Sequence, residues 1–148
     1  MIGLRPARPE DCDQVFVWRN DPVTRAMSRT SGPLQPEAHA RWWGEALANA
    51  ELILLIGEEG GGPVGVIAFG RREPGSWEAS MHLGPEHRGR GLAAPLLDAA
   101  IAYAFPDGPP RLLAQIKPEN AGSRRVFERC GFREQGVLDE VLLYERPA

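Results

Sequence analysis

The chain has 148 residues, of which 43% are hydrophobic and 25% charged, and its formal net charge is −3. This composition predicts one globular domain, residues 1–148, with enough apolar surface for a core. A mildly acidic chain gives no reason to expect nucleic acid or an anionic membrane as a partner, and no apolar run is long enough to span a bilayer. Because no secretory leader is recognisable, we expect a cytoplasmic protein. The 3 histidines and 2 cysteines have no metal-ligand spacing, so no metal is expected.

Hydrophobic periodicity and turn residues predict alternating strands and helices in the first half of the chain. Pro9 and Pro36 suit the first turn of two helices, where a missing N–H group costs no helical hydrogen bond. The Asp21-Pro22 pair ends or interrupts the first of these helices. The expected elements are a strand at 2–6, helices beginning near 9 and 35, and a hairpin of strands at 52–56 and 64–69.

The second half continues this alternation. We expect a strand at 77–83, a helix at 92–105, a strand at 111–116, a helix at 119–130, and closing strands at 132–134 and 141–146. Gly131 suits the end of the late helix, because glycine readily adopts the left-handed conformation found there. The resulting order, β-α-α-β-β-β-α-β-α-β-β, predicts a mixed α/β fold.

A turn between the 77–83 strand and the 92–105 helix contains two arginines and two glycines. Its residues are Arg88, Gly89, Arg90, Gly91, Leu92 and Ala93. Glycines let backbone N–H groups approach a ligand closely, and a helix start presents unpaired donors at the positive end of its dipole. The turn therefore predicts a phosphate or pyrophosphate site.

Other interpretations of this turn fit less well. Gly89, Gly91 and Ala94 match a dinucleotide fingerprint, but that fold has the motif in its first strand-to-helix turn, followed by further strand–helix units. A P-loop for nucleoside triphosphates needs Gly-Lys-Ser/Thr, which the chain lacks. A solvated turn without a ligand is the remaining alternative.

Two stretches resemble one family. The pattern Arg88-x-x-Gly91-x-Ala93 resembles the acyl-CoA pyrophosphate loop of the GNAT superfamily of N-acetyltransferases, and the stretch from Asn120 to Phe132 resembles that family's late helix and Gly-Phe turn. The predicted element order matches the family over essentially the whole chain. The resemblance implies the GNAT fold, a mixed and mostly antiparallel sheet with splayed central parallel strands flanked by helices. It also implies direct transfer of acetyl from acetyl-CoA, the co-substrate, to a primary amine.

The resemblance assigns several residues to the cofactor. Backbone N–H groups of the 88–93 turn would hold the pyrophosphate, with Arg88 and Arg90 adding charge. The pantetheine arm would lie along the end of the 77–83 strand, where an N–H group near Leu83 polarises the thioester. Asn120 would hold the arm and Ser123 would lie near the phosphates, although helix capping is an alternative role for either.

Phe127 belongs to the same cofactor-binding set but departs from the family pattern. Many relatives carry a tyrosine there as general acid for the leaving thiolate. Phe127 cannot donate a proton, so another group does so, or the thiolate leaves unaided because the pKa of its thiol is about 8.5. A non-catalytic acyl-CoA-binding module is therefore an alternative function.

Glu78 and His82 are the candidate general bases. Their even spacing along the predicted strand places both on one face. Glu78 stands where several relatives carry a glutamate, and His82 lies closer to the expected thioester and titrates in a suitable range. A paired or solvated strand residue is the alternative for Glu78, and a hydrogen-bonded sheet residue for His82. His39 and His87 look like helix-surface and turn residues.

The N-terminal half is expected to bind the acceptor. The candidate substrate residues are Arg19, Asn20, Arg25 and Met27. With the later Glu-x-His-x-x-Trp-Trp pattern, this run is similar to acetyltransferases that modify nucleotide-linked amino sugars in pseudaminic acid (flagellin glycan) biosynthesis, and more loosely to N-terminal acetyltransferases of ribosomal proteins. A nucleotide-linked amino sugar is thus the expected small-molecule partner, with a protein α-amine or a polyamine as alternatives. Alternatively, the tryptophans at 18, 42 and 43 pack between helices. The sequence leaves the oligomeric state open, with a homodimer as one alternative.

Overall fold

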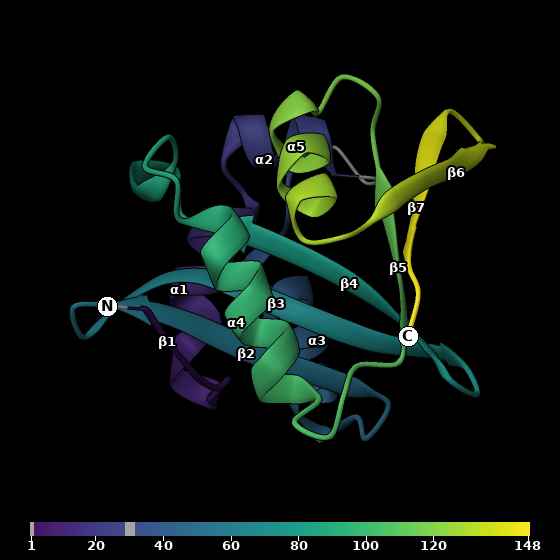
Figure 1. Cartoon of the computed structure of the whole chain (residues 1–148). Helices are drawn as coiled ribbons and strands as arrows, with labels where there is room; N and C mark the ends of the chain where they lie inside the picture. Colours follow the sequence, from purple (N-terminus) through teal and green to yellow (C-terminus); the bar gives the residue numbers. More distant parts are fainter. Residues whose placement is uncertain (1, 29–31) are drawn as a thin grey trace.

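One mixed sheet organises the computed structural model, which describes residues 2–28 and 32–148 (Figure 1). Within these residues the sheet has seven strands in the order β1-β2-β3-β4-β5-β7-β6. All neighbours pair antiparallel except β4 and β5. The strands are β1 (Ile2–Pro6), β2 (Leu52–Glu59), β3 (Gly62–Glu73), β4 (Ser76–Leu83), β5 (Arg111–Ile116), β6 (Arg133–Leu138) and β7 (Val141–Arg146). The expected mixed, mostly antiparallel sheet is confirmed.

Helices cover both faces of this sheet (Figure 1). They are α1 (Cys12–Arg19), α2 (Pro22–Met27), α3 (Pro36–Ala48), α4 (Ala93–Ala104) and α5 (Ala121–Arg129), with short 3-10 helices η1 (Pro9–Asp11) and η2 (Pro85–His87). α4 lies on one face and α1 and α3 on the other. No helix within residues 2–28 and 32–148 is long and apolar enough to cross a membrane.

Strand alternation divides the apolar residues into two cores. Odd-numbered residues of β4, such as Ala79 and Met81, face the larger core under α4 and α5. The smaller core lies under α1 and α3 and contains Trp18 and Trp43, which are 0% and 2% exposed. Val66 belongs to this smaller core and pairs with His82, so the even-numbered side chains of β4 face α1.

Several boundaries differ from the predictions for local reasons. The Asp21-Pro22 pair interrupts the first helix and starts α2, because the Asp21 carboxylate accepts hydrogen bonds from the N–H groups of Val23 and Thr24. β3 continues beyond the predicted end at residue 69 to Glu73, since its polar end still pairs with β4. β6 extends to Leu138 and turns into β7 through Asp139 and Glu140, whose φ angles are 51° and 64°.

Candidate active site

The only parallel pair in the described sheet opens into a V. β4 and β5 pair in register only from Ser76 to Glu78, opposite Arg111 to Leu113. Beyond this point β4 continues to Leu83 and β5 to Ile116 as they diverge (Figure 1). The predicted splay of the central parallel strands is confirmed, and it leaves one edge of β4 open. We call this opening the split.

Backbone donors of β4 face the split. The N–H group of Gly84 donates to the Val64 carbonyl at 2.9 Å, which places it toward β3. Because successive N–H groups of a strand point to opposite edges, those of Leu83 and Met81 point away from β3, into the split. This orientation supports Leu83 as a donor to the thioester. Sequence reasoning missed Met81, although its spacing of two from Leu83 was a usable signal.

The glycine turn lies where β4 ends and α4 begins. Gly89 and Gly91 both have a φ angle of 72°, a conformation that side-chain-bearing residues adopt at a cost. Ala93 starts the 12-residue α4, so unpaired N–H groups at its first turn adjoin the two glycines. The backbone of the turn is therefore suited to an anion, as the sequence predicts.

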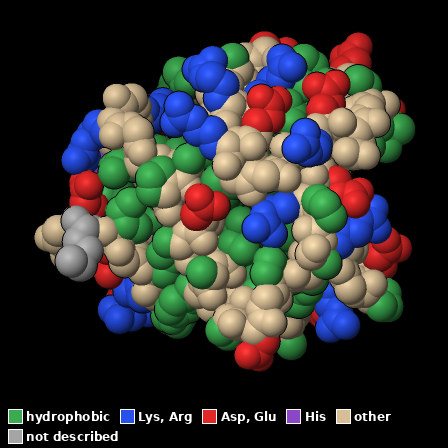
Figure 2. Space-filling view, in the orientation of Figure 1, with side chains coloured by type: hydrophobic (Ala, Val, Ile, Leu, Met, Phe, Trp, Pro, Cys, Tyr) green, Lys and Arg blue, Asp and Glu red, His purple; other side chains and the backbone are tan. Residues whose placement is uncertain are grey.

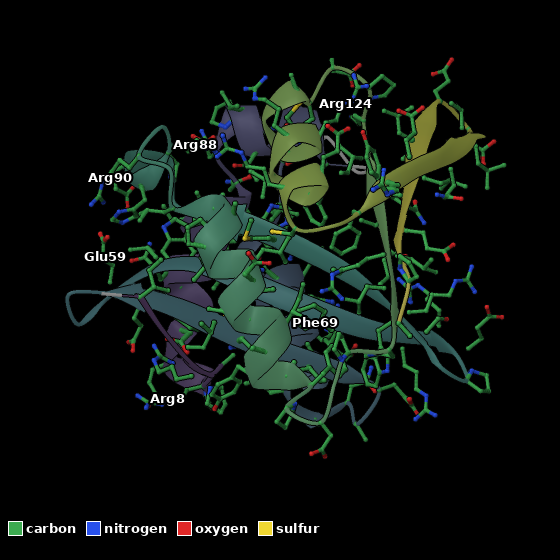
Figure 3. The ribbon with its side chains drawn as sticks, in the orientation of Figure 1. Arg8, Glu59, Phe69, Arg88, Arg90 and Arg124 are labelled. Atoms are coloured by element: carbon green, nitrogen blue, oxygen red, sulfur yellow. The ribbon has the colours of Figure 1, made fainter. Side chains whose placement is uncertain are left out.

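The two arginines of the turn contact neighbouring elements (Figure 3). Arg88 donates from Nη2 to Oδ2 of Asp21 at 3.0 Å and to the Thr24 hydroxyl, both in the α2 region. Arg90 donates from Nη2 to Oε1 of Glu59 at 2.7 Å. Arg88 thus joins the predicted pyrophosphate turn to α2, a role that the sequence did not predict.

α5 adjoins this end of the sheet and carries basic residues. Figure 2 shows Lys and Arg side chains over the part of the surface that α5 forms. Asn120 caps α5, because its Oδ1 accepts from the Ser123 N–H at 3.2 Å, which leaves its amide nitrogen as the donor for a pantetheine arm. Phe127 is 4% exposed and packs on Phe132 with ring centroids 5.0 Å apart. This core position disfavours the predicted direct contact of Phe127 with the cofactor.

Glu78 lies at the closed end of the split. Its carboxylate pairs with Arg72 at 2.9 Å and accepts from the Gln115 amide on β5 at 3.4 Å. Five residues of extended chain separate it from Leu83, roughly 16 Å. The paired-residue alternative therefore describes Glu78 well, and a direct contact with an amine at Leu83 would need a bridging water.

His82 is half-buried on the α1 face of β4, beside the thioester position expected at Leu83. Burial, with a smaller contribution from the charges of Arg19 and Arg88, lowers the pKa of His82 to about 4. The imidazole is therefore neutral at pH 7 and able to accept a hydrogen bond.

The predicted substrate residues lie at the junction of α1 and α2. Asn20 and Arg25 shape this junction: the Asn20 side-chain oxygen accepts from the Leu34 N–H at 3.0 Å, and Arg25 Nε donates to the Asn20 carbonyl at 3.2 Å. Met27, the last residue of α2, is half-buried. Arg19 ends α1, with its guanidinium carbon 4.5 Å from the Trp42 ring centroid.

The tryptophans divide between core and surface, and His39 corrects a prediction. Trp18 and Trp43 pack the smaller core, as the alternative interpretation stated, whereas Trp42 is 38% exposed. His39 is not a surface residue but is 3% exposed, because its ring lies among Phe16 and both α3 tryptophans.

Comparison with known proteins decides the family. A family model for the acetyltransferase (GNAT) domain matches residues 2–133. The chain belongs to this family. It is an N-acetyltransferase, and acetyl-CoA is its co-substrate.

Relatives with assigned activities resemble the chain over most of its length. It is 32% identical over 145 residues to the L-methionine sulfoximine/L-methionine sulfone acetyltransferase of Salmonella typhimurium, an alignment of 95% of this chain and 85% of the relative. Its identity to the L-amino acid N-acyltransferase MnaT of Escherichia coli is 28%, over 95% and 84% of the two chains. Both relatives act on amino acids or amino-acid derivatives, so enzymes of this family transfer acyl groups to small-molecule amines.

A solved structure confirms the fold. The spermidine N-acetyltransferase of Vibrio cholerae, crystallised with CoA and spermine, has a TM-score of 0.87 at 18% identity, over 97% of this chain and 94% of that one. This likeness bears on the GNAT fold alone.

Proposed function

We propose that this enzyme acetylates the primary amine of a small molecule by direct transfer from acetyl-CoA, without an acetylated enzyme intermediate. The observation that carries this proposal is the split, since its open β4 edge presents the N–H groups of Met81 and Leu83 beside the glycine turn. A pantetheine arm can add to such an edge as a strand does, while the turn holds the pyrophosphate.

In this proposal Leu83, His82 and Glu78 each have a separate role in acetyl transfer. The Leu83 N–H group stabilises the oxyanion as the amine nitrogen bonds to the acetyl carbon. His82, which is neutral, accepts a hydrogen bond from the amine and takes its proton once C–N bond formation has made the nitrogen acidic. Glu78 fixes the closed end of the split through Arg72 and Gln115 and acts on the amine only through water.

The departing thiolate needs no tyrosine in this scheme. Its pKa of about 8.5 makes it a competent leaving group, and Phe127 remains a core residue. The hydroxyl of Tyr144 donates to Glu128 Oε2 at 2.9 Å and so is engaged on α5. A nucleotide-linked amino sugar and an amino acid are the two acceptor classes that we carry forward. Cytoplasmic location and a homodimer stay predictions.

Release of free thiol from acetyl-CoA tests the proposal. The purified chain is assayed with L-methionine sulfone, a UDP-linked amino sugar and spermidine, while CoA binding is measured by calorimetry. Acetylation of at least one amine, without acetyl retained on the protein, is expected. CoA binding without turnover of any amine would favour the non-catalytic module instead.

A further inference from the structure

The guanidinium of Arg19 is held by neutral groups. It lies over the Trp42 ring at 4.5 Å, and its Nη1 is 3.4 Å from Nδ1 of His39. Within residues 2–28 and 32–148, no carboxylate oxygen lies in ion-pair range of Arg19, whereas Arg72, Arg88 and Arg90 each pair with an acid.

The hydrogen bonds of His39 fix its tautomer. Its Nε2 lies 3.0 Å from the Cys12 carbonyl oxygen, which can only accept, so Nε2 carries the proton. Nδ1 then has a free lone pair and accepts from Arg19 Nη1. Because burial lowers the pKa of His39, the ring stays neutral and orients Arg19 without cancelling its charge.

Burial of the Arg19 charge costs free energy when no anion lies beside it. The Arg19 side chain is half-buried, and desolvation lowers its pKa. A partly desolvated guanidinium usually has an acidic partner, and it forms strong paired hydrogen bonds with carboxylates and phosphates. A fixed, half-buried cation without an acidic partner is therefore typical of a site for an anionic ligand.

The end of α1 lies beside the proposed reaction centre. A Cβ atom added to Gly84 would lie 2.5 Å from Nε1 of Trp18, so the residue before Arg19 packs directly on the residue after Leu83. The side chain of His82 faces the same side of the sheet. An anion bound by Arg19 would thus belong to the acceptor.

We propose that Arg19 binds an anionic oxygen group of the acceptor, a carboxylate or a phosphate, and that His39 and Trp42 position it for this role. This inference rests on the proposed function. It identifies the substrate class as amines that also carry an anionic group, and it disfavours polyamines, whose positive charge Arg19 would repel. An amino acid and a nucleotide-linked amino sugar both carry the required anion.

Paired acceptors test the inference. L-Methionine sulfone and its α-carboxamide keep the same amine and differ in one negative charge, while the UDP-linked amino sugar supplies phosphate instead. We expect wild type to prefer an anionic acceptor and Arg19→Gln to raise the KM for it by about 10- to 100-fold. The kcat, the KM for the carboxamide and CoA affinity should change little. Arg41→Gln removes an exposed arginine from the neighbouring α3 and is the matched control.

Each outcome decides the inference. A selective KM effect on the amino acid identifies a carboxylate as the anion, and one on the nucleotide sugar identifies a phosphate. Equal effects of Arg19→Gln on charged and amidated acceptors, or turnover of spermidine alone, would overturn the inference while leaving the proposed function intact. Absence of turnover with any amine would instead refute the proposed function.

A positioning role for His39 has its own readout. His39→Phe removes the Nδ1 acceptor and should raise the KM for the anionic acceptor less than Arg19→Gln does. Its kcat should be unchanged, and its effect should vanish in the Arg19→Gln background, because Arg19 then has no guanidinium to orient. Additive losses in the double variant would contradict the positioning role.

Discussion

Removal of the Leu83 N–H group probes the proposed oxyanion donor most directly. This N–H points into the split, so Leu83→Pro deletes it without breaking a hydrogen bond to β3, and the Gly84-to-Val64 bond remains. The preceding residue, His82, is already extended, as a residue before proline prefers to be. The perturbation is therefore confined to the edge that faces the cofactor.

The expected loss follows from the role of a single donor. One oxyanion hydrogen bond contributes about 10²- to 10³-fold to kcat, or roughly 3–4 kcal/mol in the activation free energy. Steady-state thiol release at saturating acceptor measures kcat, and calorimetry measures CoA affinity. Leu83→Ala keeps the N–H group but loses the apolar side chain, which packs against the larger core, and so separates packing from catalysis.

A second perturbation keeps the test decisive if the proline variant does not fold. Replacing Leu83 by its α-hydroxy analogue converts the amide to an ester, which removes the N–H donor with the leucine side chain intact and also makes the His82 carbonyl a weaker acceptor. A kcat within threefold of wild type in this variant, with normal CoA affinity, would refute the assignment of Leu83 as the oxyanion donor.

Three further predictions concern the surroundings of this donor. Gly84→Ala should lower the free energy of unfolding by about 1–3 kcal/mol in urea titrations, because its methyl group would meet the rigid Trp18 indole; an unchanged midpoint would contradict this packing. Because the pKa of His82 falls to about 4 on folding, stability should decline as pH falls from about 6.5 to about 4, by up to about 3 kcal/mol, and His82→Gln should flatten that slope. Arg88→Gln should raise the acceptor KM more than it weakens CoA binding, since Arg88 joins the glycine turn to Asp21 at the start of α2; an effect on CoA alone would show that Arg88 serves the phosphates.

The fold could be predicted because its signals are local. Apolar alternation, prolines at helix starts and glycine turns each act over a few residues, and they gave the order of strands and helices. The predicted ends of strands and helices were wrong where strand pairing or helix capping sets them. β3 continues to Glu73 because β4 supplies partners for polar residues, and Asp21 starts a new helix because its carboxylate caps α2.

Sequence alone predicts the part of the site that binds acetyl-CoA better than the part that binds the acceptor. The glycine turn and the Leu83 edge are built from backbone within a short stretch, so motif and strand period suffice to place them. The setting of Arg19 depends on side chains from α1 and α3 and on the Cys12 carbonyl, 27 residues from His39. No local pattern marks His39 as buried or as the acceptor for Arg19. The setting of Arg19, a half-buried and desolvated charge held by a neutral histidine and a tryptophan ring, exists only after α1 and α3 have packed. Acceptor chemistry in this chain is therefore a property of tertiary contacts, which is why acceptor pairs differing in a single charge test it better than motif comparison.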